Sequence, residues 1–260
     1  MKNIKNKFTI CFLLGFIMFF IREIYFAIIY LYNICLTRTN KFAMMKLLDV
    51  RKETKSFDKT TLFAEWFVNN SHKWVIVLHG YGANGRLMYY VAKRFYKKGY
   101  NVLLPDLRAH GLSGGKYVGM GWHDRLDLIE WIKKVTKIDK NAKIVLYGVS
   151  MGATTSLMAS GEKLPKNVKC IISDCAFTSD YEVVKHQLKK SKKVPVIPFL
   201  FIMNIICKIK NGYSLKQAST IKQVKKNKLP IFFIHGATDD FVPTYMVFDL
   251  YKQANCEKEL

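Results

Sequence analysis

The sequence predicts an α/β protein built on a doubly wound, mainly parallel sheet. Short runs of apolar, often β-branched residues alternate with stretches of helical spacing, a pattern typical of parallel strands joined by crossover helices. Several of the apolar runs are nearly continuous, as expected for strands buried on both faces. We expect strands at 62–68, 74–78, 101–104, 143–149, 168–174 and 229–234. We expect helices at about 87–98, 122–134 and 245–254, and a further helix directly after residue 150.

Composition excludes some classes of protein. Half of the 260 residues are apolar, which rules out global disorder and suggests one large domain with an appendage. The 42 basic and 19 acidic residues give a net charge of +23, which suits nucleic acid or an anionic membrane as partner. Because Lys greatly outnumbers Arg and no basic stripe with interleaved aromatic residues occurs, we expect no nucleic-acid binding. A solvated, lysine-rich surface is the preferred interpretation.

No cofactor or metal is expected. The six cysteines are scattered, and none forms a Cys-x-x-Cys pair. The glycine-rich segment 111–115 lacks both the spacing and the following helix of a dinucleotide-binding motif.

The N-terminal region predicts a membrane anchor. Residues 8–36 are apolar except for Arg22 and Glu23, and no small-x-small cleavage site follows. A span of about 20 residues within this region is long enough to cross a bilayer. A soluble amphipathic helix is the alternative, but apolar residues occur on every face. We therefore predict an uncleaved single-pass anchor over 1–37 in the cell membrane, followed by a domain over 49–260. Basic residues flank both ends, so the positive-inside rule leaves the orientation open, with an extracytoplasmic domain preferred.

The sequence Gly148-Val149-Ser150-Met151-Gly152 predicts a sharp turn from a strand into a helix. A side chain at either glycine is expected to collide with neighbouring backbone. Ser150 should then stand at the apex of the turn, at the positive end of the helix. The pattern is specific because of its place between a strand and a helix.

Three further turn motifs follow predicted strands in the same order along the chain. With the Ser150 turn, they are the segments 79–82 (HGYG), 106–113 (DLRAHGLS), 148–152 (GVSMG) and 235–243 (HGATDDFVP). From about residue 74 onward, the chain resembles the α/β-hydrolase fold superfamily, in particular the bacterial membrane-anchored serine hydrolases of the serine aminopeptidase-like or esterase-like branch. The ends of such strands form the ligand-binding edge of open α/β sheets.

This resemblance implies a serine hydrolase that cleaves a carboxylic ester, or alternatively an amide or small peptide, through an acyl-enzyme on Ser150. It implies backbone N–H groups of Tyr81 and Met151 as the oxyanion hole. Asp239 falls where the family places the acid that orients the catalytic imidazole, with its neighbour Asp240 as the alternative. The physiological substrate is not indicated.

The sequence departs from the family at the catalytic histidine. That residue is expected one strand after Asp239, and Leu260 looks like the first residue of this strand. His79, His110 and His235 lie inside turn motifs, where the family uses histidine for packing and loop hydrogen bonds. We therefore expect a truncated form that lacks the last strand, the last helix and the histidine. The alternative is a natural short form that binds a ligand without turnover.

Residues 178–228 interrupt the strand–helix rhythm and predict a helical cap. Twelve lysines, against Asp180 and Glu182, surround an apolar run at 194–207. The preferred interpretation is a cap helix buried over the active site, with the lysines as its solvated rim. The second interpretation is that the cap also rests on an anionic bilayer.

Overall fold

The computed structural model describes residues 50–191 and 195–260. The described elements belong to one compact unit, Leu48–Leu260. The anchor predicted over 1–37 lies outside the described residues. Within the described ranges, no helix has both the length and the apolar character needed to cross a membrane.

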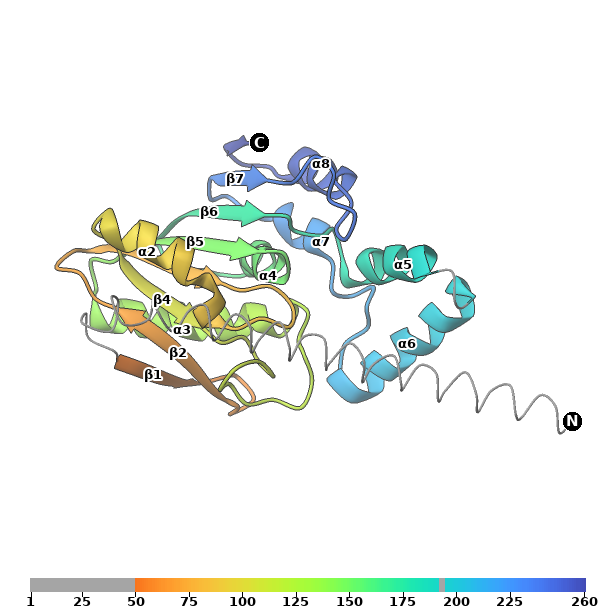
Figure 1. Ribbon diagram of the computed structural model, residues 1–260, viewed down its shortest axis with the longest axis horizontal. Helices are drawn as coiled ribbons and strands as arrows, with labels where there is room; N and C mark the ends of the chain where they lie inside the picture. Colours follow the sequence, from red (N-terminus) through yellow and green to blue (C-terminus); the bar gives the residue numbers. More distant parts are fainter. Residues whose placement is uncertain (1–49, 192–194) are drawn as a thin grey trace, which may run out of the picture. The chain divides into compact units, whose positions relative to one another are not determined.

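The centre of the unit is an eight-stranded sheet with the order β1-β2-β4-β3-β5-β6-β7-β8 (Figure 1). Its strands are β1 (Val50–Lys55), β2 (Thr61–Phe67), β3 (Lys73–Leu78), β4 (Asn101–Pro105), β5 (Lys143–Val149), β6 (Val168–Asp174), β7 (Ile231–Ile234) and β8 (Lys258–Glu259). Only the β1–β2 and β2–β4 pairs are antiparallel. The predicted mainly parallel sheet is confirmed.

The two ends of the sheet differ from the sequence prediction. No specific strand was predicted at β1, because its sequence VRKETK has no apolar alternation. It forms a strand by pairing along its whole length with β2. At the other end, the next strand was expected to begin at Leu260, but Lys258 and Glu259 already pair with β7 as β8. The predicted start of this strand at Leu260 is therefore wrong, because the strand begins at Lys258.

The helices follow the predicted rhythm. They are the 3-10 helix η1 (Gly85–Met88), α2 (Tyr89–Lys97), α3 (Asp124–Ile138), α4 (Met151–Ala159), α5 (Asp180–Ser191), α6 (Val196–Asn211), α7 (Thr220–Val224) and α8 (Tyr245–Gln253). Helix α2 covers the front of the sheet in Figure 1, whereas α3 and α4 lie behind it. Helix α2 ends at Lys97, and the left-handed Gly99, with φ 82°, follows its C-cap residue Lys98.

The insert between β6 and β7 divides into two parts. Helices α5 and α6 lie beyond the carboxyl ends of β5 and β6 (Figure 1). Helix α7 instead packs against α4 and α8 in the layer behind the sheet. The helical cap over 178–228 is therefore narrower than predicted, since its last helix is part of the main fold.

The core lies between the sheet and its helices. All five residues from Trp74 to Leu78 in β3 are buried, as expected for a central parallel strand. Trp74, Ile76 and Leu78 of β3 share one hydrophobic cluster with Leu128, Trp131 and Ile132 of α3. This core fixes the carboxyl edge of the sheet, where the predicted site residues lie.

Candidate active site

Ser150 occupies a strained turn between β5 and α4. Its backbone has φ 53° and ψ −114°, a conformation that non-glycine residues seldom adopt. Its N–H donates a hydrogen bond to the main-chain oxygen of Asp174 on the adjacent strand, at 2.7 Å. A Cβ at Gly148 would lie well inside 3.0 Å of the Gly152 backbone, and one at Gly152 equally close to the carbonyl of Leu78. The predicted steric reason for both glycines is confirmed.

The segment that carries Tyr81 adjoins this turn. A Cβ built on Gly80 would be 3.6 Å from the Cβ of Ser150, so the loop after β3 runs directly beside the serine. His110 holds that loop, because its Nε2 accepts a hydrogen bond from the N–H of Gly82 at 3.1 Å. The Tyr81 ring also stands edge-on to the His110 ring, with centroids 6.0 Å apart.

Met151 is the first residue of α4 and directly follows Ser150. The first N–H groups of a helix have no carbonyl partner within the helix, and they form its positive end. The residues predicted to supply the oxyanion-hole amides, Tyr81 and Met151, thus come from the two segments that border Ser150.

The loop after β4 is a scaffold for these segments. The carboxylate of Asp106 accepts hydrogen bonds from the N–H groups of Gly85 and Leu112, both at 2.8 Å. Arg108 binds both carboxylate oxygens of Asp127, each at 2.7 Å, in a buried bidentate ion pair. The segment 106–113, which the sequence singled out, therefore acts as a braced loop.

His79 and His235, like His110, form hydrogen bonds that hold turns together, as expected. His79 accepts a hydrogen bond from the N–H of Leu107 through Nε2 at 2.9 Å, and burial, with a further contribution from His110, lowers the pKa of His79 to about 3. His235 donates from Nε2 to the carbonyl oxygen of Val242 at 2.8 Å.

The remaining three histidines also have partners other than Ser150. His72 binds Asp139, the ring of His123 packs on Phe57 and Tyr213, and His186 contacts the main-chain oxygen of Asp240. All six histidines lie among the described residues, and each has an identified partner away from the serine.

The two adjacent carboxylates after β7 differ in environment. Oδ1 of Asp239 accepts hydrogen bonds from the N–H groups of Phe241 and Val242, both at 2.9 Å, and its side chain is 22% exposed. Asp240 is 79% exposed and pairs with Lys190 at 2.5 Å. The turn holds Asp239 in one orientation, whereas Asp240 points to solvent and the cap.

Asp174 is a residue of the site for which the sequence analysis gave no role. It ends β6 beside the Ser150 turn, and its Oδ2 accepts a hydrogen bond from the hydroxyl of Tyr147 at 3.2 Å. Burial raises the pKa of Asp174, and the nearby charge of Asp239 adds to the rise. Asp239 follows β7, which pairs with β6, so it lies at the carboxyl end of the sheet two strands from β5. An acidic residue at the end of the strand next to the serine strand was the available sequence signal.

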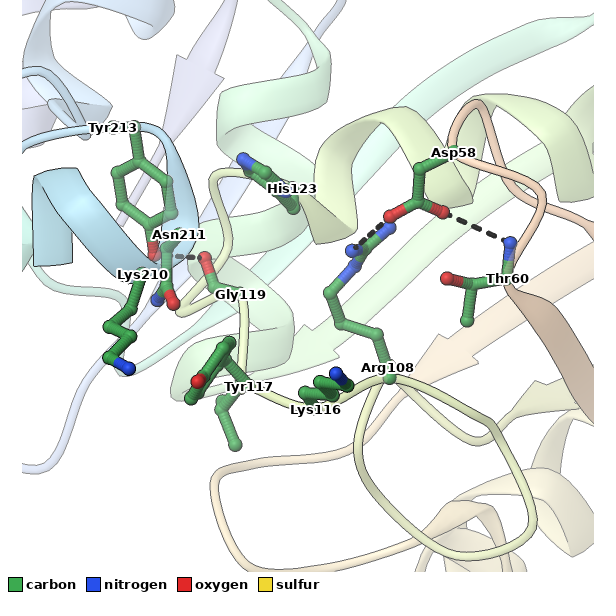
Figure 2. Close-up of a pocket in the computed structure, with 12 residues that line it drawn as sticks. Asp58, Thr60, Arg108, Lys116, Tyr117, Gly119, His123, Lys210, Asn211 and Tyr213 are labelled. Carbon is green, nitrogen blue, oxygen red and sulfur yellow. Dashed lines mark hydrogen bonds and ion pairs between the residues drawn. The ribbon is translucent and has the colours of Figure 1, made fainter.

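A cavity of about 590 Å³ lies between the β1–β2 turn, the loop after β4 and the C-terminal end of α6 (Figure 2). Its lining residues are Asp58, Thr60, Arg108, Gly115, Lys116, Tyr117, Val118, Gly119, His123, Lys210, Asn211 and Tyr213. Ser150 is not among them. The hydroxyl of Tyr213 donates to the carbonyl of Gly119 at 2.8 Å and ties the end of the cap to this loop.

The described part of the chain holds no cluster of three or more histidine, cysteine or acidic side chains suited to a metal ion.

Comparison with known proteins gives consistent results. Residues 73–195 match the family model described as alpha/beta hydrolase fold. The chain is 30% identical over 187 residues to the protein YqkD of Bacillus subtilis (strain 168), a match that covers 72% of this chain and 61% of that protein. A 31.7 kDa protein encoded in the traX-finO intergenic region of Escherichia coli is 27% identical over 171 residues, which cover 64% of this chain and 58% of that protein. The matches thus span about three fifths of the length of these relatives.

Solved structures show the same fold. The esterase Pf2001 of Pyrococcus furiosus is 28% identical, with a TM-score of 0.66, and the likeness covers 82% of each chain. The esterase EaEST of Exiguobacterium antarcticum is 19% identical, with a TM-score of 0.59, over 80% of this chain and 89% of that one. Together with the strand order and the Ser150 turn, these likenesses establish that this chain has the alpha/beta hydrolase fold.

Proposed function

We propose that this protein is a serine hydrolase that cleaves carboxylic esters through an acyl-enzyme on Ser150. The observation that carries the proposal is the strained turn at Ser150, with φ 53° and two flanking glycines that leave no room for a side chain. Strain of this kind persists only where the surrounding structure imposes it, and it is concentrated at functional sites. The similarity to an esterase from P. furiosus supports the ester as the substrate class.

In the proposed reaction, Oγ of Ser150 attacks the ester carbonyl and forms a tetrahedral intermediate. The N–H groups of Tyr81 and Met151 stabilise its oxyanion, a contribution of about 3–4 kcal/mol per donor in comparable sites. Collapse of the intermediate expels the alcohol and leaves the acyl group on Ser150, and water then releases the acid.

A general base must take the proton from Oγ and return it to the leaving alcohol. The proposal gives Asp239 the role of orienting an imidazole, because hydrogen bonds within its turn fix its carboxylate. The six histidines of this sequence have other partners, so we propose that the imidazole belongs to a segment outside these 260 residues. Hydrolysis of an amide or small peptide fits the same chemistry.

The proposed location is the cell membrane, with the apolar segment at 1–37 as a single-pass anchor and the hydrolase domain outside the cytoplasm. The sequence pattern of residues 8–36 supports the anchor.

The proposal is tested by trapping the nucleophile. The protein is incubated with a fluorophosphonate or with p-nitrophenyl acetate, with and without added imidazole, and the intact mass and modified peptide are measured. We expect one adduct on Ser150, formed faster with imidazole, and none with Ser150→Ala. Asp239→Asn is expected to slow acylation more than Asp240→Asn does. A chain that forms no adduct under either condition contradicts the proposal.

A second candidate is a protein that binds a ligand at the same edge without turnover. The engagement of all six histidines away from Ser150 favours it. A catalytic site without its full triad still retains about 10³–10⁴-fold acceleration over water in serine proteases. The absence of any acyl-enzyme with imidazole present would favour this candidate.

A further inference from the structure

Helix α6 exposes an unusual amount of apolar surface. Of its 16 residues, Leu200 alone is buried. The exposed fractions reach 81% at Ile197, 66% at Phe201 and 74% at Ile209. Its exposed large apolar residues are Ile197, Phe199, Phe201, Ile202, Ile205, Ile206 and Ile209, and we call them the α6 apolar face.

Helical geometry shows that these side chains share one side. At about 100° per residue, the α6 apolar face covers roughly 200° of the helix circumference. The opposite side carries the buried Leu200 together with the partly buried Asn204 and Cys207. The pattern is thus the reverse of an ordinary surface helix, which turns its apolar side inward. The preferred sequence interpretation, a cap helix buried over the site, is therefore wrong for the outer side of α6.

The charged residues of α6 itself, Lys208 and Lys210, are both basic. No aspartate or glutamate occurs between Glu182 and Asp239 in the sequence. On the helical projection, the exposed Lys208 and Lys210 stand at the two edges of the α6 apolar face. The exposed Lys189 and Lys190 lie in the last turn of the neighbouring helix α5, where Lys190 pairs with Asp240.

We propose that α6 docks on an anionic lipid bilayer and lies in the plane of its surface. An apolar side about half a turn wide, bordered by lysines, has the chemistry of interfacial helices, whose apolar side enters the boundary between headgroups and acyl chains. The lysines then face the anionic headgroups, which attract basic residues near the surface. Seven exposed large apolar side chains gathered on one side of a helix mark an interaction site. This inference does not depend on the proposed hydrolase activity.

Docking through α6 would bring the bilayer to the cap, on the side of the sheet where its carboxyl edge lies. Figure 1 shows α5 and α6 beyond the carboxyl ends of β5 and β6, the edge on which Ser150 lies. A water-insoluble ligand released from the bilayer would then arrive beside the site.

A site-specific probe tests the proposal in the full chain, where the N-terminal segment can bind vesicles by itself. An environment-sensitive fluorophore is attached to an azido amino acid placed at Ile205. The matched control carries it at Ile138, which is 55% exposed at the end of α3. Each protein is mixed with vesicles of phosphatidylcholine alone or with phosphatidylglycerol, some of them containing lipids with quenchers on the acyl chains.

We expect the emission at position 205 to shift to the blue and to be quenched on anionic vesicles, whereas position 138 changes little. Lys208→Gln with Lys210→Gln should reduce the shifted fraction about 25-fold at limiting lipid, since each lysine contributes about fivefold. Lys140→Gln with Lys143→Gln, at the opposite edge of the sheet, serves as the matched charge control and should have little effect.

Three results would overturn the proposal. One is an equal shift on neutral vesicles, which would show that α6 does not require anionic headgroups for binding. Another is a probe at 205 that is already shielded before lipid is added, which would show that a second copy or another segment of the chain covers α6. The third is no shift on any vesicle, which would leave α6 in water.

Discussion

Helices α4 and α6 are both predominantly free of charged residues, yet the structure treats them in opposite ways. Every residue of α4 is buried, including Thr154, Thr155 and Ser156, whereas α6 buries only Leu200. Helix α4 packs against β5, β6, α3 and α7, while α6 packs against α5 in the cap. The difference teaches that the position of a helix between layers, rather than its apolar content, decides its burial.

The hydroxyl groups of α4 can be buried because the backbone satisfies them. Thr155 donates to the carbonyl of Met151 at 2.8 Å, and Thr154 accepts from the N–H of Phe177 at 3.1 Å. Such bonds remove most of the cost of burying a polar group. In α6, by contrast, Oδ1 of the partly buried Asn204 has no hydrogen-bond partner in the structure as described.

The largest expected effect comes from a comparison of Gly152 in α4 with Gly212, the C-cap residue of α6. Gly152→Ala in α4 places a Cβ well inside 3.0 Å of two carbonyl groups, so its cost should exceed the ~1–3 kcal/mol of ordinary core overpacking. Gly212→Ala, at the end of α6, meets no atom within 4 Å and faces only its positive φ, a cost of about 1 kcal/mol. Urea denaturation measures both free energies of unfolding. Equal costs would contradict the close packing at the Ser150 turn.

The next comparison removes one apolar side chain from each helix. Leu157→Ala in α4 should cost about 2–5 kcal/mol, because its side chain is fully buried and leaves a cavity. Ile205→Ala in α6, 41% exposed, should change the free energy of unfolding by no more than about 0.5 kcal/mol. The same denaturation experiment without lipid applies. A large loss for Ile205→Ala would mean that the α6 apolar face is covered within the folded chain.

A smaller effect concerns Asp180, which begins α5 at the inner side of the cap. Burial raises the pKa of Asp180 well above 3.8, and Asp124 adds to the rise. Burial, with a contribution from Asp127, also raises the pKa of Asp124 to about 7. An acid whose pKa is higher in the folded state binds more protons there than in the unfolded state. The contribution of these two carboxyls to the free energy of unfolding is therefore largest below about pH 4, and it falls as the pH rises toward 7 and beyond.

Asp180→Asn should therefore reduce the fall in melting temperature between pH 5 and pH 8. Asp249→Asn, at an exposed site on α8, is the control and should leave the fall unchanged. An identical pH dependence for wild type and Asp180→Asn would show that Asp180 is ionised in the folded protein.

The smallest effect is expected at the contact between the cap and the β7 turn. Both side chains of the Asp240–Lys190 ion pair are exposed, and water and salt screen such pairs. Asp240→Asn should leave the melting temperature unchanged within error. A clear decrease would show that the cap depends on this ion pair for its position.

The sequence by itself determined the central strands, the order of the four turns and the close packing around Ser150. These features are local or repetitive: apolar runs predict buried strands, and two glycines flanking a serine predict a turn with no space for side chains. From the sequence, motif spacing was the only reason to prefer Asp239 over Asp240. The structure adds that their hydrogen bonds and exposure differ.

Only the tertiary structure decided where polar and apolar segments find partners. Strand β1 forms from a charged sequence because β2 offers a complete set of backbone partners. The contact of Asp174 with Tyr147 and the Ser150 turn depends on strands β5 and β6 lying side by side. The outward direction of the α6 apolar face follows from how the cap packs on α5, because the same helical sequence could bury either side. Pairing between distant segments is a property of the assembled fold, and local residue patterns do not contain it.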